Sequence, residues 1–198
     1  TDKIIPARFL RRLREPGYEK LAFHDIRYDA DGKDRPDFVL NQAPYRNAKI
    51  LVAGANFGCG SSREAAVYVM WDYGIRSVIA TSFGDIHYGN ELQNGMLPVV
   101  LPDATCQKLR QQLREKPGAQ ITVDLETQTV TGPDGATHRF EIDPSHKERL
   151  LKGLDDIGRP RLDPQGVSEQ GGGGLQVAEH RLVLPGQGDP PGHVGRVQ

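Results

Sequence analysis

The chain has 198 residues, and its 25 lysine and arginine residues are almost balanced by 26 aspartate and glutamate residues. This balance argues against a nucleic-acid-binding protein held by a basic face, for which a domain pI above about 9 is typical. No apolar run approaches the roughly 18–20 residues of a membrane span, and the start, TDKIIPARFL, lacks the apolar stretch of a secretory signal. We therefore expect a cytoplasmic protein without nucleic-acid or membrane partners.

The first half of the chain alternates between strand-like and helix-like segments. Short apolar runs before glycines or turns predict buried strands, and longer segments that end at a glycine predict helices. In chain order these segments are 49–54 (strand), 62–73 (helix, ending at Gly74), 77–81 (strand), 83–94 (short helix or turn region) and 97–102 (strand). Such alternation favours a parallel α/β unit.

The second half of the domain changes its pattern. Residues 103–116 predict an amphipathic helix that is closed by Pro117 and Gly118. Residues 120–126 and 137–142 alternate with period two on either side of a Pro-Asp-Gly turn, so they predict antiparallel strands. Residues 145–156 predict a last short helix. The fold class is therefore α/β.

The end of the chain differs in composition from the rest. Residues 158–198 contain ten glycines and five prolines, whereas all 13 aromatic residues lie at or before Phe140. Such a segment buries too little apolar surface to offset the entropy of ordering it. The sequence thus predicts a folded domain over 1–157 and a low-complexity, disordered tail over 158–198. The apolar cluster at 177–184 is the part of this tail that we expect to dock weakly.

A glycine-rich stretch, GANFGCGSSRE at 54–64, lies between a predicted strand and a predicted helix. Ser61 and Glu64 match a capping box, with Ser61 as the N-cap of the helix. A helix N-terminus attracts anions, and Arg63 adds a planar fork that suits a carboxylate or a phosphate. These features predict an anion site with serine hydroxyls beside it; the alternative is a capped turn without a ligand. Neither a Walker loop nor G-x-G-x-x-G is present.

The exact residues around this stretch carry a resemblance to a known family. NFGCGSSRE at 56–64, DYGIRSVIATSFGDI at 72–86 and NGMLP at 94–98 resemble the small subunit of 3-isopropylmalate dehydratase, also called isopropylmalate isomerase. The same pattern is less closely similar to the swivelling C-terminal domain of aconitase. The N-terminal TDKIIPARFLRR and LLKGLDDIG at 150–158 extend the resemblance over about 1–158. It implies a layered β/β/α swivelling domain.

The resemblance also implies a function. The family interconverts 2-isopropylmalate and 3-isopropylmalate by removing and re-adding water in leucine biosynthesis, and its small subunit is active only with an iron–sulfur large subunit. The large subunit carries a [4Fe-4S] cluster, and the substrate is a small dicarboxylate hydroxy acid. A cluster needs three cysteine ligands, and this chain has only Cys59 and Cys106, 47 positions apart. We therefore expect no metal or cofactor on this chain.

By the same resemblance, Ser61 matches the catalytic serine base. Ser62 and Arg63 match residues that bind substrate carboxylates. A serine is a poor base unless its alkoxide is stabilised, and a helix N-terminus with an arginine can supply that stabilisation.

The N-terminal segment supplies three further candidates. Phe9, Leu10 and Arg11 match the loop that discriminates the substrate side group. The first two suit an isopropyl group and Arg11 suits a carboxylate, although ordinary core packing is the alternative for Phe9 and Leu10. Thr1 and Asp2 match a pair near the site.

Other readings stay open. Many family members have histidine after the serine-arginine-glutamate triplet, where this chain has Ala65. This departure leaves open, as an alternative, a related dehydratase whose substrate is another small malate derivative, such as a methylmalate. A further alternative is an inactive copy that binds a carboxylate or the partner. For His87, packing or a surface position is favoured over a proton-shuttle role, and Ser82 and Asn90 are expected to shape the glycine-rich loop.

Overall fold

Two β-sheets and the helices around them build the fold of this computed structural model, which describes residues 1–61, 63–153 and the backbone of 181–183. The first sheet is parallel and has the order β1-β2-β3. Its strands are β1 (Ile50–Val52), β2 (Ser77–Ala80) and β3 (Leu97–Val100). The three strands predicted from apolar runs are thereby confirmed.

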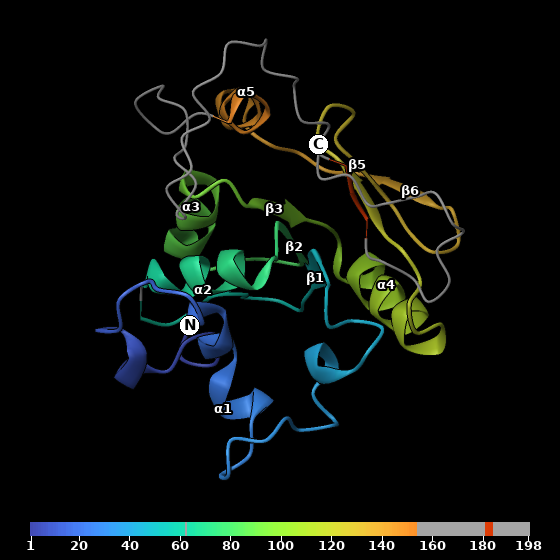
Figure 1. The fold of residues 1–198 in the computed structure, drawn as a ribbon. Coiled ribbons are helices and arrows are strands. Elements are labelled where there is room, and N and C mark those ends of the chain that lie inside the picture. The colour runs from blue at the N-terminus through green and yellow to red at the C-terminus, as the bar shows by residue number, and fades with distance from the viewer. Residues whose placement is uncertain (62, 154–180, 184–198) are drawn as a thin grey trace, which may run out of the picture.

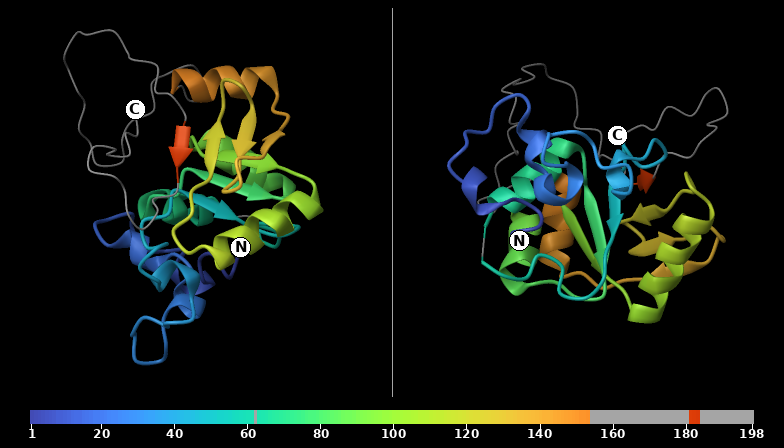
Figure 2. Two further views of the ribbon diagram at one scale, coloured as in Figure 1. Left: turned by 90° about the vertical axis from the view of Figure 1, so that its right-hand side faces the viewer. Right: turned by 90° about the horizontal axis from the view of Figure 1, so that it is seen from below.

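Helices cover both faces of the parallel sheet. The crossover helices are α2 (Ala65–Tyr73), between β1 and β2, and α3 (Asp85–Gln93), between β2 and β3. Helix α4 (Asp103–Glu115) packs against β1 and β2. Figure 2, right, shows α2 and α3 on one side of the parallel sheet, with α4 and the second sheet on the other. All four residues of β2 are fully buried, as a central strand between two layers requires.

The second sheet is antiparallel and has the order β6-β5-β4-β7. Its first three strands are β4 (Thr122–Asp124), β5 (Thr129–Thr131) and β6 (Thr137–Arg139). The prediction of two antiparallel strands around the Pro-Asp-Gly turn was incomplete, because β5 lies between them and pairs with both. The polar threonines at both ends of β5 hid this three-residue strand in the sequence.

The end of the domain carries a helix and a short strand. Helix α5 (Pro144–Lys152) begins after Asp143, whose carboxylate accepts from the backbone N–H of Ser145 at 2.8 Å, and it ends at Gly153 with φ +62°. Strand β7 (Arg181–Val183) pairs antiparallel with β4. This pairing lies in the apolar cluster for which the sequence predicted docking. The rest of the predicted tail and its boundary at 157 lie outside the described residues.

The N-terminal region precedes β1 and runs beside α2 (Figure 1). It contains three 3₁₀ turns, η1 (Ala7–Phe9), η2 (Tyr18–Leu21) and η3 (Val39–Asn41), and the one-turn helix α1 (His24–Arg27). Turn η2 packs closely on α2. Sequence patterns predicted no element here, because turns this short carry no period.

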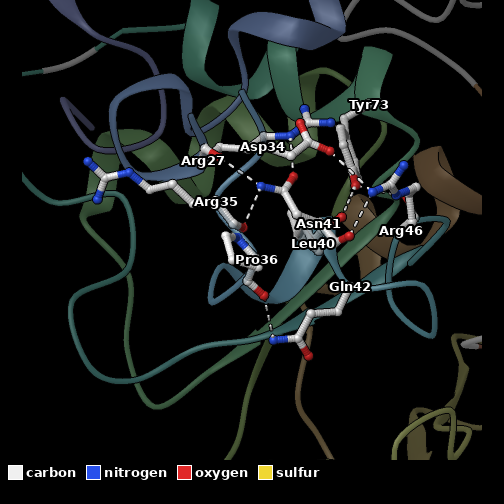
Figure 3. A network of polar contacts seen from close by, with 9 residues as sticks. All are labelled: Arg27, Asp34, Arg35, Pro36, Leu40, Asn41, Gln42, Arg46 and Tyr73. Atoms are coloured by element: carbon white, nitrogen blue, oxygen red, sulfur yellow. Dashed lines mark hydrogen bonds and ion pairs between the residues drawn. The ribbon is translucent and has the colours of Figure 1, made fainter. Parts of the chain in front are cut away.

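A polar network holds the irregular part of this region together (Figure 3). The buried Asn41 amide donates to the carbonyls of Arg27 at 2.7 Å and Arg35 at 3.0 Å. The Tyr73 hydroxyl at the end of α2 donates to the carbonyl of Arg46 at 2.8 Å. Because these bonds satisfy backbone groups that lie outside helices and strands, the segment is fixed to α2 without regular structure.

Candidate active site

The glycine-rich loop lies at the carboxyl edge of the parallel sheet. It leaves the end of β1, and residues 81–84 leave the end of the neighbouring strand β2. The Ala53 N–H continues the ladder to the Ile79 carbonyl at 2.8 Å, so the two segments leave the sheet side by side. In open α/β sheets this edge is where ligands bind.

The first half of the loop is held by the segment after β2. The Phe57 N–H donates to the Ser82 carbonyl at 2.9 Å, and the Gly84 N–H donates to the Phe57 carbonyl at 2.8 Å. The Ser82 hydroxyl accepts from the Asn56 N–H at 2.8 Å. Ser82 therefore shapes the loop, as the sequence predicted.

Two glycines turn the chain between the halves of the loop. Gly58 has φ +70° and Gly60 has φ +110°, a region that side chains rarely tolerate. A Cβ on Gly58 would also lie 2.1 Å from the ring of His87, so the backbone rests directly on the imidazole. The turn delivers Ser61 to an exposed position at the edge of the sheet.

The second half of the loop is held by the start of the chain. The backbone nitrogen of Thr1 donates to the Cys59 carbonyl at 2.6 Å, and its hydroxyl donates to the Ser61 carbonyl. Arg63 Nη1 donates to the carboxylate of Asp2 and, at 3.3 Å, to the carbonyl of Ile5. The structure thus brings Thr1, Asp2, Ser61 and Arg63 together, in agreement with the predicted place of the Thr-Asp pair.

The predicted capping box is wrong. Helix α2 begins at Ala65 with Glu64 at the N-cap position, and no side chain caps it. The Glu64 carboxylate accepts instead from the Asn94 side chain at 3.1 Å. The helix begins later than predicted: Gly60 has φ +110°, and the hydroxyl of Thr1 donates to the Ser61 carbonyl, so the chain bends at residues 60 and 61 before the helix begins.

Among the serine-arginine candidates, Ser61 is exposed and Arg63 is mostly buried. The Arg63 side chain is 12% exposed, whereas that of its partner Asp2 is 65% exposed. Ser62 lies outside the described residues. The arrangement offers an exposed hydroxyl two residues from a guanidinium that an acidic side chain already orients, which suits a ligand with carboxylates.

The three candidates at 9–11 are placed differently from one another. Phe9 is partly buried, and its ring lies 4.8 Å from that of His24, under the guanidinium of Arg8 at 4.4 Å. Leu10 is 39% exposed and Arg11 is exposed. In the described part of the chain, no hydrogen bond or ring contact joins these three side chains to the loop at 59–63.

A buried polar pair beneath the loop was not identified from the sequence. His87 Nε2 on α3 lies 3.1 Å from Glu91 Oε1, and the two side chains are 2% and 0% exposed. Burial raises the pKa of the Glu91 carboxyl, and the neighbouring imidazole opposes that rise. Of the two positions that the sequence favoured for His87, in the packed interior or at the surface, the structure shows the interior. Its spacing of four residues from Glu91 was the available signal, but spacing alone does not reveal burial.

The two cysteines have different surroundings. Cys59 is exposed on the loop, and Cys106 is buried in α4. Within residues 1–61 and 63–153, no group of three or more histidine, cysteine, aspartate or glutamate side chains could hold a metal ion. No helix in the same ranges has the length and hydropathy needed to cross a membrane.

Comparison with known proteins matches both parts of the domain. A family model described as the aconitase C-terminal domain matches residues 1–104, and a LeuD_N model matches residues 107–144. The 3-isopropylmalate dehydratase small subunit of Phenylobacterium zucineum is 53% identical over 158 residues, covering 80% of this chain and 77% of the relative. That of Paramagnetospirillum magneticum is 54% identical, with coverage of 80% and 79%. The crystal structure of 3-isopropylmalate dehydratase from Methanocaldococcus jannaschii superposes with a TM-score of 0.54 at 29% identity, covering 77% of this chain and 80% of that one.

Proposed function

The chain belongs to the family of 3-isopropylmalate dehydratase small subunits, and from this premise we propose that the loop at 59–63 is its part of the catalytic site. The reaction is the interconversion of 2-isopropylmalate and 3-isopropylmalate by dehydration and rehydration in leucine biosynthesis. The observation that carries the proposal is the position of Ser61, which is exposed at the carboxyl edge of the parallel sheet on a loop fixed from both sides.

In the proposed mechanism Ser61 acts as the base. Its Oγ takes the proton from the carbon next to a carboxylate, the electron pair of that C–H bond forms a double bond, and the hydroxyl leaves from the adjacent carbon. Rehydration in the opposite orientation returns the proton from Ser61 and places the hydroxyl on the other carbon. The step needs a stabilised alkoxide, which preorganised donors and a nearby positive charge can supply.

Arg63 and Ser62 are the proposed carboxylate ligands. The bond from Arg63 Nη1 to Asp2 fixes the plane of the guanidinium before the substrate arrives. A guanidinium whose orientation is already fixed loses less side-chain entropy when it binds a carboxylate. Asp2 is mostly exposed, so it can move if the substrate competes for the same nitrogen.

Leu10 and Arg11 are the proposed contacts to the substrate side group and to a second carboxylate. Both are exposed, whereas Phe9 is held by Arg8 and His24. We therefore assign Phe9 to fixing the shape of this segment as well as to the apolar wall of the site.

The large subunit is the proposed partner, and the cytoplasm is the proposed location of the complex. This chain has only two cysteines, one of them buried in α4, so its own residues do not fit a [4Fe-4S] cluster. We place that cluster on the large subunit, where it would supply Lewis-acid chemistry at the substrate hydroxyl.

Anaerobic reconstitution with the iron–sulfur large subunit tests the proposal. The unsaturated acid formed from 3-isopropylmalate is followed by its ultraviolet absorbance, with each chain alone as the control. We expect signal only when both chains are present. A stable complex that turns over methylmalates but not 3-isopropylmalate would change the assigned substrate to a methylmalate. A stable complex without any turnover would contradict the catalytic role.

A further inference from the structure

The pair formed by His87 and Glu91 is the least expected feature of the interior. Both side chains are essentially fully buried and they contact each other at 3.1 Å. Within the described residues, neither the His87 nitrogens nor the Glu91 carboxylate oxygens have a well-aligned hydrogen-bond partner. Buried polar groups with so few partners are costly, so a polar pair at this place calls for a reason other than stability.

The pair lies directly beneath the glycine-rich loop, and this position suggests a role in holding the loop. The His87 ring contacts two consecutive residues of the glycine-rich loop at 54–64, Phe57 and Gly58. The ring of Phe57 lies 5.4 Å away in an edge-on arrangement, and the backbone of Gly58 lies so close that a Cβ would come within 2.1 Å of the imidazole carbons. Ser61 follows three residues after Gly58, with no regular structure between them.

The contacts around the pair leave the loop little freedom on this side. Gly84, at the start of α3, donates to the Phe57 carbonyl, and a Cβ on Gly84 would lie 3.1 Å from the Cα of Cys59. The start of α3 and the imidazole one turn later therefore form one contact surface on which residues 57–59 rest.

We propose that His87 and Glu91 are positioning residues: Glu91 fixes the orientation of the His87 ring, and the ring fixes the Gly58 peptide and through it Ser61. This inference deepens the proposed function because it concerns the same serine. Neither residue touches the substrate. Their effect is on the geometry of the loop, so it appears in kcat rather than in KM.

Two variants of Glu91 separate positioning from bulk packing. Glu91→Leu keeps the volume and removes the polar contact, whereas Glu91→Gln keeps both the shape and a polar group that can reach Nε2. The matched control is Glu148→Leu, which removes the acid of another i,i+4 pair, with Lys152, on the exposed face of α5. The readouts are kcat and KM of the complex reconstituted with the large subunit, and amide hydrogen exchange of the full chain alone.

We expect Glu91→Leu to lower kcat at least tenfold, with KM within about twofold of wild type. The Phe57 and Gly84 amides should exchange at least tenfold faster, while amides of α4 keep their rates. Glu91→Gln should restore kcat to within about threefold, and Glu148→Leu should change neither readout. Wild-type kcat and wild-type exchange in Glu91→Leu, or equal acceleration of all amides, would overturn the inference.

A measurement on the wild-type chain covers the case in which Glu91→Leu does not fold. We expect a nuclear Overhauser effect between the Gly58 α-protons and the ring proton on Cδ2 of His87, because these groups are in direct contact. Its absence in the folded chain would overturn the inference. Neither this experiment nor the exchange measurement depends on turnover, so an inactive complex would contradict the proposed function without deciding the role of His87.

Discussion

The two halves of the glycine-rich loop at 54–64 are supported in different ways. Residues 56–58 rest on the interior of the domain, through backbone bonds to 82–84 and the buried ring of His87. Thr1 and Asp2 hold Cys59, Ser61 and Arg63 from outside, and Asp2 is mostly exposed. Ser61 therefore lies between a segment held by the buried interior and a segment held by exposed residues at the start of the chain. The comparison indicates that interior contacts hold residues 56–58, whereas contacts with the start of the chain hold the backbone at Ser61 and the side chain of Arg63.

Breaking the interior support should have the largest effect. Gly58→Ala places a Cβ against the His87 ring at a residue with φ +70°, so the loop must move. A displacement of about 1 Å near the reacting atoms can cost about 100-fold in rate, and we expect a loss of that size in kcat of the reconstituted complex. Gly153→Ala is the matched control, because Gly153 has φ +62° with open space around it. Equal activity of both variants would contradict the rigid support.

Changing the arginine should have the next largest effect. Arg63→Lys keeps the charge and loses the planar fork, so we expect KM for 3-isopropylmalate to rise about tenfold. The control is Arg14→Lys, since Arg14 also holds a carboxylate, that of Asp72, but does so near the C-terminal end of α2. A KM that rises equally in both variants would place the effect in folding rather than in substrate binding.

Removing the exposed support should have a smaller effect. Asp2→Asn weakens an ion pair whose acidic side is 65% exposed, and such pairs contribute about 0–1 kcal/mol. We expect KM to rise a few-fold, because the guanidinium of Arg63 is then less well oriented. A KM that falls would show that Asp2 competes with the substrate carboxylate instead of preparing its binding.

A change far from the loop should alter stability alone. Hydrogen bonds from Ser145 hold the pKa of the Asp143 carboxyl below its ordinary value. The stabilisation by this cap is therefore present above about pH 4 and lost as the pH falls through the lowered value. Asp143→Ala should lower Tm by a few degrees without changing turnover, and Asp143→Asn should retain most of the cap. Thermal unfolding at pH 7 and at pH 3 checks both points, because a Tm difference that is undiminished at pH 3 would contradict the charged cap.

Sequence patterns predicted the parts of the fold that repeat a period or bury a continuous run. The strands predicted at 49–54, 77–81 and 97–102 are apolar because both faces of the sheet are covered. Their burial therefore leaves a pattern that can be recognised in the sequence. Strand β5 was missed because it is short and polar at both ends. The 3₁₀ turns before β1 were missed because side-chain bonds such as those of Asn41 hold them.

The sequence identified the loop of the candidate site but only part of its geometry. Glycines beside serines and an arginine identified the loop, but the capping box failed because contacts with Thr1, 60 residues away in the chain, keep the backbone at Ser61 out of the helix. The contact of His87 with Gly58 could not be predicted, since a histidine four residues before a glutamate does not by itself indicate burial. Contacts between residues far apart in the chain determine both the start of α2 and the contact of His87 with the loop, and local sequence patterns do not reveal such contacts.

Turnover by Ser61→Ala in the complex reconstituted with the large subunit tests the central claim most directly. We predict a loss of about 1,000-fold in kcat, with complex formation unchanged because the backbone contacts of the loop do not involve the serine hydroxyl. Turnover at the wild-type rate would contradict a catalytic serine and reduce the loop to a structural turn.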